Sequence, residues 1–274
     1  MVNIQIEIPL NIPQSNQTLR DNVFRIVLSY FSWLTLSLIA RWISKQLIPK
    51  VRAMKAKEQM LWQLSITRFI FGLPILWAAY MVYIDRRIAL DHVFASTDES
   101  WIFTCILTGY FLFEEFALIY FDIKYHGFSK ELHIHHFFVL NGCFSVAYYN
   151  RGHYYAAKTF LLQISTPFTC ICWCLLKLNL EKTKAWKINQ WILIYIFHLR
   201  SVYEIYCWYG IYQDWNYIKQ NLPWIYTINM MVGLAIITIW LTPYWTYRKT
   251  VQYFSPNYWY RENEEKNDEI NKTS

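Results

Sequence analysis

The run ELHIHH at residues 131–136 places three histidines, His133, His135 and His136, within four positions. On a helix His133 and His136 share a face at i, i+3, whereas the neighbours His135 and His136 point about 100° apart. Histidine gives or takes a proton near neutral pH and can act as a nucleophile in acyl transfer. We therefore predict that His135 and His136 are catalytic. The alternative is that histidines at a membrane boundary simply face lipid headgroups.

Two adjacent glutamates, Glu114 and Glu115, lie in an apolar segment. Glu114 is predicted to be a catalytic residue that takes a proton or orients a histidine or a substrate amine, and Glu115 to line the same site. The alternative is structural, since either glutamate could neutralise Arg68 or Arg200, and a buried charge persists when it is paired. Arg200 and Glu204, one helical turn apart, could also pair with each other.

A polar interruption, Gln163, Ser165 and Thr166 followed by Pro167, breaks another apolar segment. Proline frees a backbone carbonyl and kinks a helix, and hydroxyl side chains can satisfy the released groups. Such a kink can form the wall of a cavity. A kink required only for helix packing explains the same residues equally well.

The composition indicates that these residues lie in membrane-spanning helices. The 274-residue chain is 55% hydrophobic and only 16% charged, against about 25% charged in an ordinary globular domain. A membrane span needs about 20 mostly apolar residues. We predict an all-α polytopic membrane protein with about seven transmembrane helices, at residues 23–47, 61–84, 101–121, 133–149, 154–178, 188–208 and 224–245.

The distribution of Lys and Arg predicts the orientation. They concentrate after the first, third and fifth predicted spans and in the C-terminal tail, which places those segments in the cytosol. The formal charge of +7 is then a consequence of topology, and nucleic acid is not an expected partner. Residues 1–22 are predicted to be a lumenal or extracellular tail, residues 23–47 the first transmembrane helix and residues 251–274 a charged cytosolic tail.

Charged side chains inside these spans point to a functional cavity. Each costs at least about 2.5–3.5 kcal/mol on insertion, so lipid exposure is strongly disfavoured. We hypothesise that the polar groups face one interior cavity open toward the cytosol. Beside the catalytic residues, the predicted cavity or substrate-binding residues are Arg68, Glu115, Gln163, Ser165, Thr166, Arg200 and Glu204.

No metal or organic cofactor is expected. The closest group of thiols, Cys170, Cys172 and Cys174, lacks zinc-ligand spacing and nearby histidines. Cysteines in apolar segments are usually buried free thiols.

Several of these residues, in this order and at these membrane positions, resemble the TLC-domain proteins. That family includes the ceramide synthases, smaller TLC domain-containing proteins and the ceroid lipofuscinosis cargo receptor of the endoplasmic reticulum. The resemblance covers roughly residues 60–250 and implies a six-helix TLC-like domain. It is carried by Gly109-Tyr110 followed by Glu114, by His135-His136, by Ser165-Thr166-Pro167-Phe168 followed by Trp173, and by Phe197 with Arg200.

The chain departs from the family pattern at two positions beside the Ser165-Thr166-Pro167-Phe168 motif. Gln163 stands where many members have Glu, and Cys170 stands where Asn is common. The acidic C-terminal signature of the ceramide synthases is also missing, so the chain resembles the smaller, non-synthase branch. For His135 and His136 the resemblance implies a role in acyl transfer from acyl-CoA.

Three functions are compatible with these features. The first is lipid homeostasis through acyl-chain or ceramide and sphingolipid metabolism, in which case the protein is an acyl-CoA-dependent N-acyltransferase with acyl-CoA as co-substrate and a membrane lipid as acceptor. The second is a non-enzymatic lipid binder or regulator of phospholipid composition. The third is a trafficking cargo receptor. The resemblance implies the endoplasmic reticulum, with the plasma membrane as the alternative.

Overall fold

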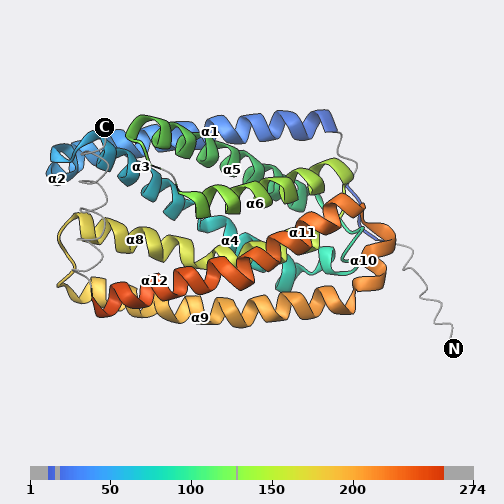
Figure 1. The fold of residues 1–274 in the computed structure, drawn as a ribbon. Helices are drawn as coiled ribbons and strands as arrows, with labels where there is room; N and C mark the ends of the chain where they lie inside the picture. The colour runs from blue at the N-terminus through green and yellow to red at the C-terminus, as the bar shows by residue number, and fades with distance from the viewer. Residues whose placement is uncertain (1–11, 16–18, 128, 256–274) are drawn as a thin grey trace.

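A computed structural model describes residues 12–15, 19–127 and 129–255, and the regular structure in these ranges is helical (Figure 1). Most of the two predicted tails, residues 1–11, 16–18 and 256–274, lies outside the described residues. The helices form a bundle of rods that run side by side (Figure 1).

Seven rods make up the described part of the bundle, and three of them contain a change of helix type. In chain order they are α1 (Leu19–Leu47), α3 (Ala56–Ile70) with α4 (Leu73–Ala79) and a π-helix (Tyr80–Asp85), α5 (Asp98–Tyr125), α6 (Lys130–Tyr149), α7 (His153–Phe160) with a 3₁₀ turn (Leu161–Ile164) and α8 (Ser165–Lys177), α9 (Lys184–Gln213), and α11 (Trp224–Ile236) with a π-helix (Ile237–Leu241) and α12 (Thr242–Phe254). Short helices α2 (Pro49–Ala53) and α10 (Trp215–Asn221) and a 3₁₀ turn (Arg87–Ala89) lie in the connections.

Five of the rods are long and apolar enough to cross a membrane, within the described residues. They are Arg20–Leu47, Ala56–Asp85, Asp98–Tyr125, His153–Lys177 and Trp224–Phe254. The other two, α6 and α9, carry the histidine run and the Arg200–Glu204 pair. At 20 residues, α6 is about 30 Å long, which is enough to cross the hydrocarbon core. The prediction of an all-α polytopic membrane protein is confirmed.

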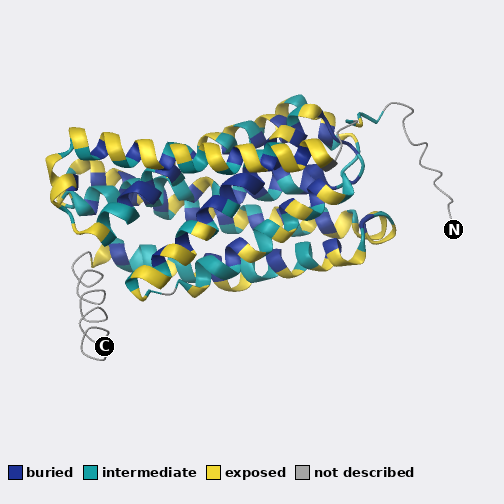
Figure 2. Ribbon diagram, turned by 90° about the horizontal axis from the view of Figure 1, so that it is seen from above, coloured by how far each residue is buried: buried dark blue, intermediate teal, exposed yellow. Residues whose placement is uncertain are grey.

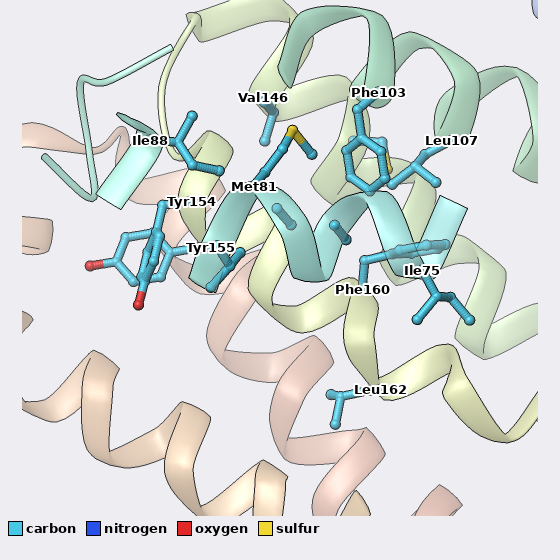
Figure 3. Close-up of a cluster of buried hydrophobic side chains, with 14 of the residues drawn as sticks. Ile75, Met81, Ile88, Phe103, Leu107, Val146, Tyr154, Tyr155, Phe160 and Leu162 are labelled. Carbon is cyan, nitrogen blue, oxygen red and sulfur yellow. The ribbon is translucent and has the colours of Figure 1, made fainter. Parts of the chain in front are cut away.

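Apolar side chains cover both the inside and the outside of the bundle. One inner cluster joins α4, α5, α6 and α7 and includes Met81, Phe103, Val146 and Phe160, each at most 5% exposed (Figure 3). The outward faces are exposed along the rods (Figure 2). They carry large apolar residues such as Phe24 on α1 and Leu199, Val202 and Ile205 on α9. Contiguous exposed apolar surface of this kind is expected on helices that face lipid.

The predicted interruption of the fifth span is present, and it packs against a second break. The 3₁₀ turn Leu161–Ile164 comes directly before α8, which contains Pro167, and Gly72 separates α3 from α4. A Cβ atom added at Gly72 would lie 2.3 Å from Pro167 Cγ. Glycine therefore permits the two broken rods to approach each other at this level.

The connection between α6 and α7 is a tight turn. Asn150 and Gly152 adopt positive φ angles of 51° and 75°, a conformation in which glycine and asparagine are the least strained residues. The Arg151 side chain donates a hydrogen bond to the Asn221 carbonyl, and its guanidinium lies over the ring of Phe94. This turn fixes α6 and α7 as antiparallel neighbours.

Candidate functional site

A continuous row of ionisable side chains runs from α3 through α5 to the beginning of α6. We call this row the polar chain and define it by six residues, named in order of contact: Arg68, Glu114, His136, Glu115, His133 and Asp122.

His136 lies between the two glutamates. Its Nδ1 is 2.9 Å from Glu115 Oε2, and its Nε2 is 3.8 Å from Glu114 Oε2. Glu115 also contacts His133, whose Nδ1 lies 2.6 Å from Oε1 and whose Nε2 lies 2.7 Å from Asp122 Oδ2. The i, i+3 spacing predicted that His133 and His136 share a face, and both contact Glu115 from it.

Glu114 forms an ion pair with Arg68. The sequence allowed either Arg68 or Arg200 as its partner, and the structure shows that Arg68 is the one. Both groups are largely removed from solvent, because the Glu114 side chain is 6% exposed and that of Arg68 is 20% exposed. Within the described residues, Arg68 Nη2 is buried and has no hydrogen-bond partner. The pair neutralises two charges that lipid would otherwise exclude.

His135 points away from the polar chain. Its Nε2 lies 2.8 Å from the side-chain nitrogen of Gln163, and the Gln163 oxygen accepts a hydrogen bond of 3.2 Å from Thr166 Oγ1. His135 Nδ1 is buried and has no hydrogen-bond partner in the part of the chain that the structure describes. The two adjacent histidines therefore have different environments: His136 faces carboxylates, whereas His135 faces a neutral amide at Nε2 and has a buried Nδ1 atom without a partner.

The amide of Gln163 matters for the protonation of His135. A side-chain amide can present either its NH₂ group or its oxygen, so it accommodates either neutral tautomer of the imidazole. A carboxylate in the same place would accept a hydrogen bond only from an N–H group. Gln163 thus leaves His135 free to use Nδ1 either as a donor or as an acceptor toward a bound molecule.

His135 lines a cavity of about 110 Å³ between α5, α6, α7 and α11. His135 and Gln163 form one end of its wall, and the remaining lining is mostly apolar. Gly142 and Gly233 lie on facing helices and both line the cavity, and Gly233 permits the close approach of Phe138. Asn229 supplies a polar group. An apolar cavity of this size has room for a small apolar group.

Arg200 and Glu204 form a second polar cluster, in the interior of α9. Arg200 Nε lies 3.1 Å from Glu204 Oε1, and both side chains are at most 2% exposed. Thr242 Oγ1 donates a hydrogen bond of 2.5 Å to the same carboxylate oxygen. The ring of Trp245 lies between this cluster and the cavity, since its centroid is 5.9 Å from that of His135 and 5.4 Å from the Arg200 guanidinium carbon.

The predicted site residues are therefore divided between three neighbouring environments. Of the predicted residues, His135 and Gln163 line the cavity. The polar chain holds Arg68, Glu114, Glu115 and His136, and the α9 cluster holds Arg200 and Glu204. Ser165 is buried and Thr166 contacts Gln163. We hypothesised that all these groups face one cavity. In the structure most of them form ion pairs beside a mostly apolar cavity, which of the predicted residues only His135 and Gln163 line.

Two members of this region were missed in the sequence. Asp122 closes the polar chain and lies at i+7 from Glu115, so the two carboxylates share a face of α5. That spacing was a usable signal. Trp245 gave no such signal, because its position between His135 and Arg200 depends on how α12 packs against α6 and α9.

A separate histidine–carboxylate group lies at the opposite end of the bundle, near α10. We call it the loop cluster and define it by His92, Asp214 and Tyr155. His92 Nδ1 lies 2.6 Å from Asp214 Oδ2, and Tyr155 donates a hydrogen bond of 2.8 Å to the same oxygen. Burial acts to raise the pKa of Asp214, but the hydrogen bonds from His92 and Tyr155 outweigh it and hold the pKa below its usual value.

Among the described residues, no group of three or more His, Cys, Asp or Glu side chains is arranged to hold a metal ion. The cysteines of the run 170–174 are free thiols, and Cys170 and Cys172 are buried.

Fold and site together define a helical membrane protein with a histidine at an intramembrane cavity and a buried row of ion pairs beside it. The TLC domain family model matches residues 61–249, which contain every predicted site residue. The chain belongs to the TLC domain family.

Proteins named CLN8 are similar to the chain over most of its length. The protein of Canis lupus familiaris is 33% identical over 238 residues, which cover 85% of this chain and 82% of the dog protein. The Rattus norvegicus protein is 31% identical over 263 residues, covering 90% of this chain and 91% of the rat protein. The Homo sapiens protein is 31% identical over 236 residues, covering 85% and 82%. No solved structure matches the chain significantly.

Proposed function

We propose that this protein is an acyltransferase of membrane lipid metabolism, in which His135 acts on an acyl chain held in the cavity between α6, α7 and α11. The observation that carries the proposal is the buried Nδ1 atom of His135, which has no hydrogen-bond partner in the described residues and belongs to a side chain that lines a mostly apolar cavity. A buried polar atom without a partner is costly unless a bound molecule satisfies it.

The proposed reaction joins an acyl group from acyl-CoA to a nucleophile on a membrane lipid. The acyl–sulfur bond breaks and an acyl–nitrogen or acyl–oxygen bond forms, while the proton of the attacking amine or hydroxyl passes to His135 and from there to the departing thiolate. His136 is a positioning residue in this scheme, because both its ring nitrogens face carboxylates. Membership of a family that includes the ceramide synthases supports the proposal.

The predicted orientation also supports acyl-CoA as the donor. The helix α2 and the α8–α9 connection lie at one end of the bundle, and α10 lies at the other (Figure 1). The first end carries Lys50, Arg52 and Lys182, so the positive-inside rule assigns it to the cytosol. Acyl-CoA would then reach the polar chain and the cavity from the cytosol. We place the protein in the endoplasmic reticulum membrane by resemblance to the family.

The proposal is tested by acyl transfer in membranes from cells that lack the protein and are rescued with variants. Isotope-labelled acyl-CoA is supplied with either a sphingoid base, which offers an amine, or a lysophospholipid, which offers a hydroxyl group. Wild type should produce labelled product with one acceptor class, and the His135→Ala, His136→Ala variant should lose that product at equal expression.

The matched control is His198→Ala, because His198 also lies in a transmembrane rod but is exposed on α9. It should retain full activity. Equal product from wild type and the double variant with both acceptors would exclude histidine chemistry and leave a lipid-binding or regulatory role.

A second candidate is a trafficking receptor, the function of the cargo-receptor branch in the resemblance. The similarity to CLN8 proteins favours it, because the match extends beyond residues 61–249 to most of the chain. Crosslinking in cells distinguishes the two: client proteins captured equally by wild type and by the double histidine variant, with unchanged lipid profiles, would support the receptor and contradict the enzyme.

A further inference from the structure

A groove of about 440 Å³ lies between α1 and α5, and none of its lining residues lines the cavity of His135. Its walls are Arg25, Leu28, Ser29, Ser32, Trp33 and Leu36 on α1 with Ile102, Cys105 and Ile106 on α5. Small residues create the close helix contact beside it, since a Cβ atom added at Gly109 would lie 2.5 Å from Ser29 Cβ.

The groove presents an apolar surface with one charged group. Its two serine hydroxyls are satisfied by the backbone: Ser29 donates to the Ile106 carbonyl at 3.1 Å and Ser32 to the Leu28 carbonyl at 2.8 Å. Leu28 and Ile102 are 56% and 40% exposed and would meet lipid directly. The side chain that brings charge to this surface is Arg25.

Arg25 carries a buried nitrogen atom, Nη1, without a hydrogen-bond partner in the described part of the chain. The side chain as a whole is partly buried. A guanidinium group is always charged and presents several donors in a planar fork that matches a phosphate. Arg25 lines the groove, where its charge is partly removed from water, and an anion is the ligand that stabilises a partly desolvated guanidinium group.

The position of Arg25 along α1 matches the headgroup region of a bilayer. Arg25 and Arg41 are 16 residues apart, or about 24 Å along the helix, close to the hydrocarbon thickness of about 30 Å. From Arg25 to Leu36 the groove extends 11 residues, or about 16 Å, which is about the depth of one leaflet. An anionic group at Arg25 and an acyl chain in the groove can therefore belong to the same lipid molecule.

We propose that the α1–α5 groove binds one phospholipid from the leaflet at the N-terminal end of α1, with its phosphate on Arg25 and one acyl chain between Leu28 and Ile102. This site is independent of the proposed acyltransferase chemistry. It lies largely on α1, which precedes the matched TLC domain. Its lipid is a bound ligand rather than a substrate, because His135 lines a different cavity.

The test uses full-length protein reconstituted into phosphatidylcholine vesicles that contain a trace of diazirine-labelled phosphatidylcholine. After photolysis, mass spectrometry gives the ratio of label on residues 28–36 and 102–106 to label on residues 191–206, whose outward face reports ordinary lipid contact. A second arm uses a diazirine-labelled diacylglycerol, which has the same acyl chains and no phosphate.

In the wild type the ratio should be at least tenfold higher with phosphatidylcholine than with diacylglycerol, a difference of about 1.4 kcal/mol. Arg25→Gln should lose this preference, and Arg25→Lys should retain part of it, because an ammonium keeps the charge without the planar fork. Arg20→Gln, an exposed residue on the same helix, is the matched control and should behave as wild type. Thermal unfolding of each variant shows whether it is folded.

Two results would overturn the proposal. Equal ratios for the two lipids in the wild type would mean that the groove is filled by any acyl chain, and this comparison needs no variant. Absence of lipid label in the groove, together with chain-to-chain crosslinks at residues 28–36 when a bifunctional crosslinker is added to the same vesicles, would mean that a second copy of the chain covers it.

Discussion

Two histidine–carboxylate groups lie at opposite ends of this bundle, and they differ in what they leave unsatisfied. In the loop cluster, Asp214 accepts from both His92 and Tyr155, and the group ties a connection to the ends of α7 and α9. In the polar chain, histidines and carboxylates lie inside the bundle. Its member Arg68 and the neighbouring His135 each keep a buried nitrogen atom without a partner in the described residues. A network in which the polar atoms have partners stabilises a fold, whereas a network that keeps buried polar atoms without partners is suited to binding a ligand.

The largest effect should follow from breaking the polar chain at Glu114. Glu114→Gln leaves the Arg68 guanidinium buried without its counter-charge, and removing one partner of a buried ion pair costs about 3 kcal/mol. The change is measured as a lower unfolding temperature in detergent. The double variant Arg68→Gln, Glu114→Gln should recover part of the loss. A single variant as stable as wild type would show that the pair is not buried in the membrane-embedded protein.

The loop cluster should respond less, and its response should depend on pH. Asp214→Asn removes the charge from two hydrogen bonds, so the expected loss of stability at pH 7 is about 1.5 kcal/mol. Because the pKa of Asp214 is lower in the folded chain, its stabilisation is present above the usual value of 3.8 and is lost as the pH falls through the folded value.

Unfolding temperatures measured from pH 7 down to acid should therefore converge for wild type and Asp214→Asn. Acyl transfer at pH 7 should not change in this variant. A difference in stability that persists at acid pH, or a loss of activity without a loss of stability, would contradict a purely structural loop cluster.

Glu115→Gln separates the two roles within the polar chain. Glu115 contacts His133 and His136 but is 21% exposed, so the cost in stability should be about 1 kcal/mol, as for an ordinary hydrogen bond. If the polar chain positions His136 for the proposed reaction, acyl transfer should fall by about tenfold. Activity that falls only in proportion to the amount of folded protein would assign Glu115 to structure.

The smallest effect is expected at the cavity wall. A Cβ atom at Gly142 would lie 3.7 Å from Asn229 Nδ2, an ordinary contact, and alanine favours a helix over glycine by about 1 kcal/mol. Gly142→Ala should keep or slightly raise the unfolding temperature. Because it narrows the cavity, it should shift the acyl-chain preference toward shorter chains. A clear loss of stability would show that the wall is tighter than the structure indicates.

The sequence was informative wherever the property is local. Apolar length predicted the helical rods, including one near residues 133–149 that begins at Lys130 in the structure. Helical periodicity put His133 and His136 on one face and separated His135 from it. The i, i+4 spacing allowed Arg200 and Glu204 to pair. Each of these follows from helix geometry within one or two turns.

The sequence was uninformative wherever a choice of partner depends on packing. Glu114 could have paired with Arg68 or Arg200, and the contact between α3 and α5 selects Arg68. The loop cluster joins His92 to Asp214, 122 positions later, and no spacing rule reaches that far.

The sequence by itself determined the class of protein. A helix that spans a lipid bilayer must be about 20 residues long and mostly apolar, and segments of this kind can be recognised directly in the sequence. What the tertiary structure decided is which buried charges meet and which atoms stay without a partner. Those outcomes depend on the relative rotation and spacing of rods far apart in the chain, set here by contacts such as Gly72 with Pro167 and Gly109 with Ser29.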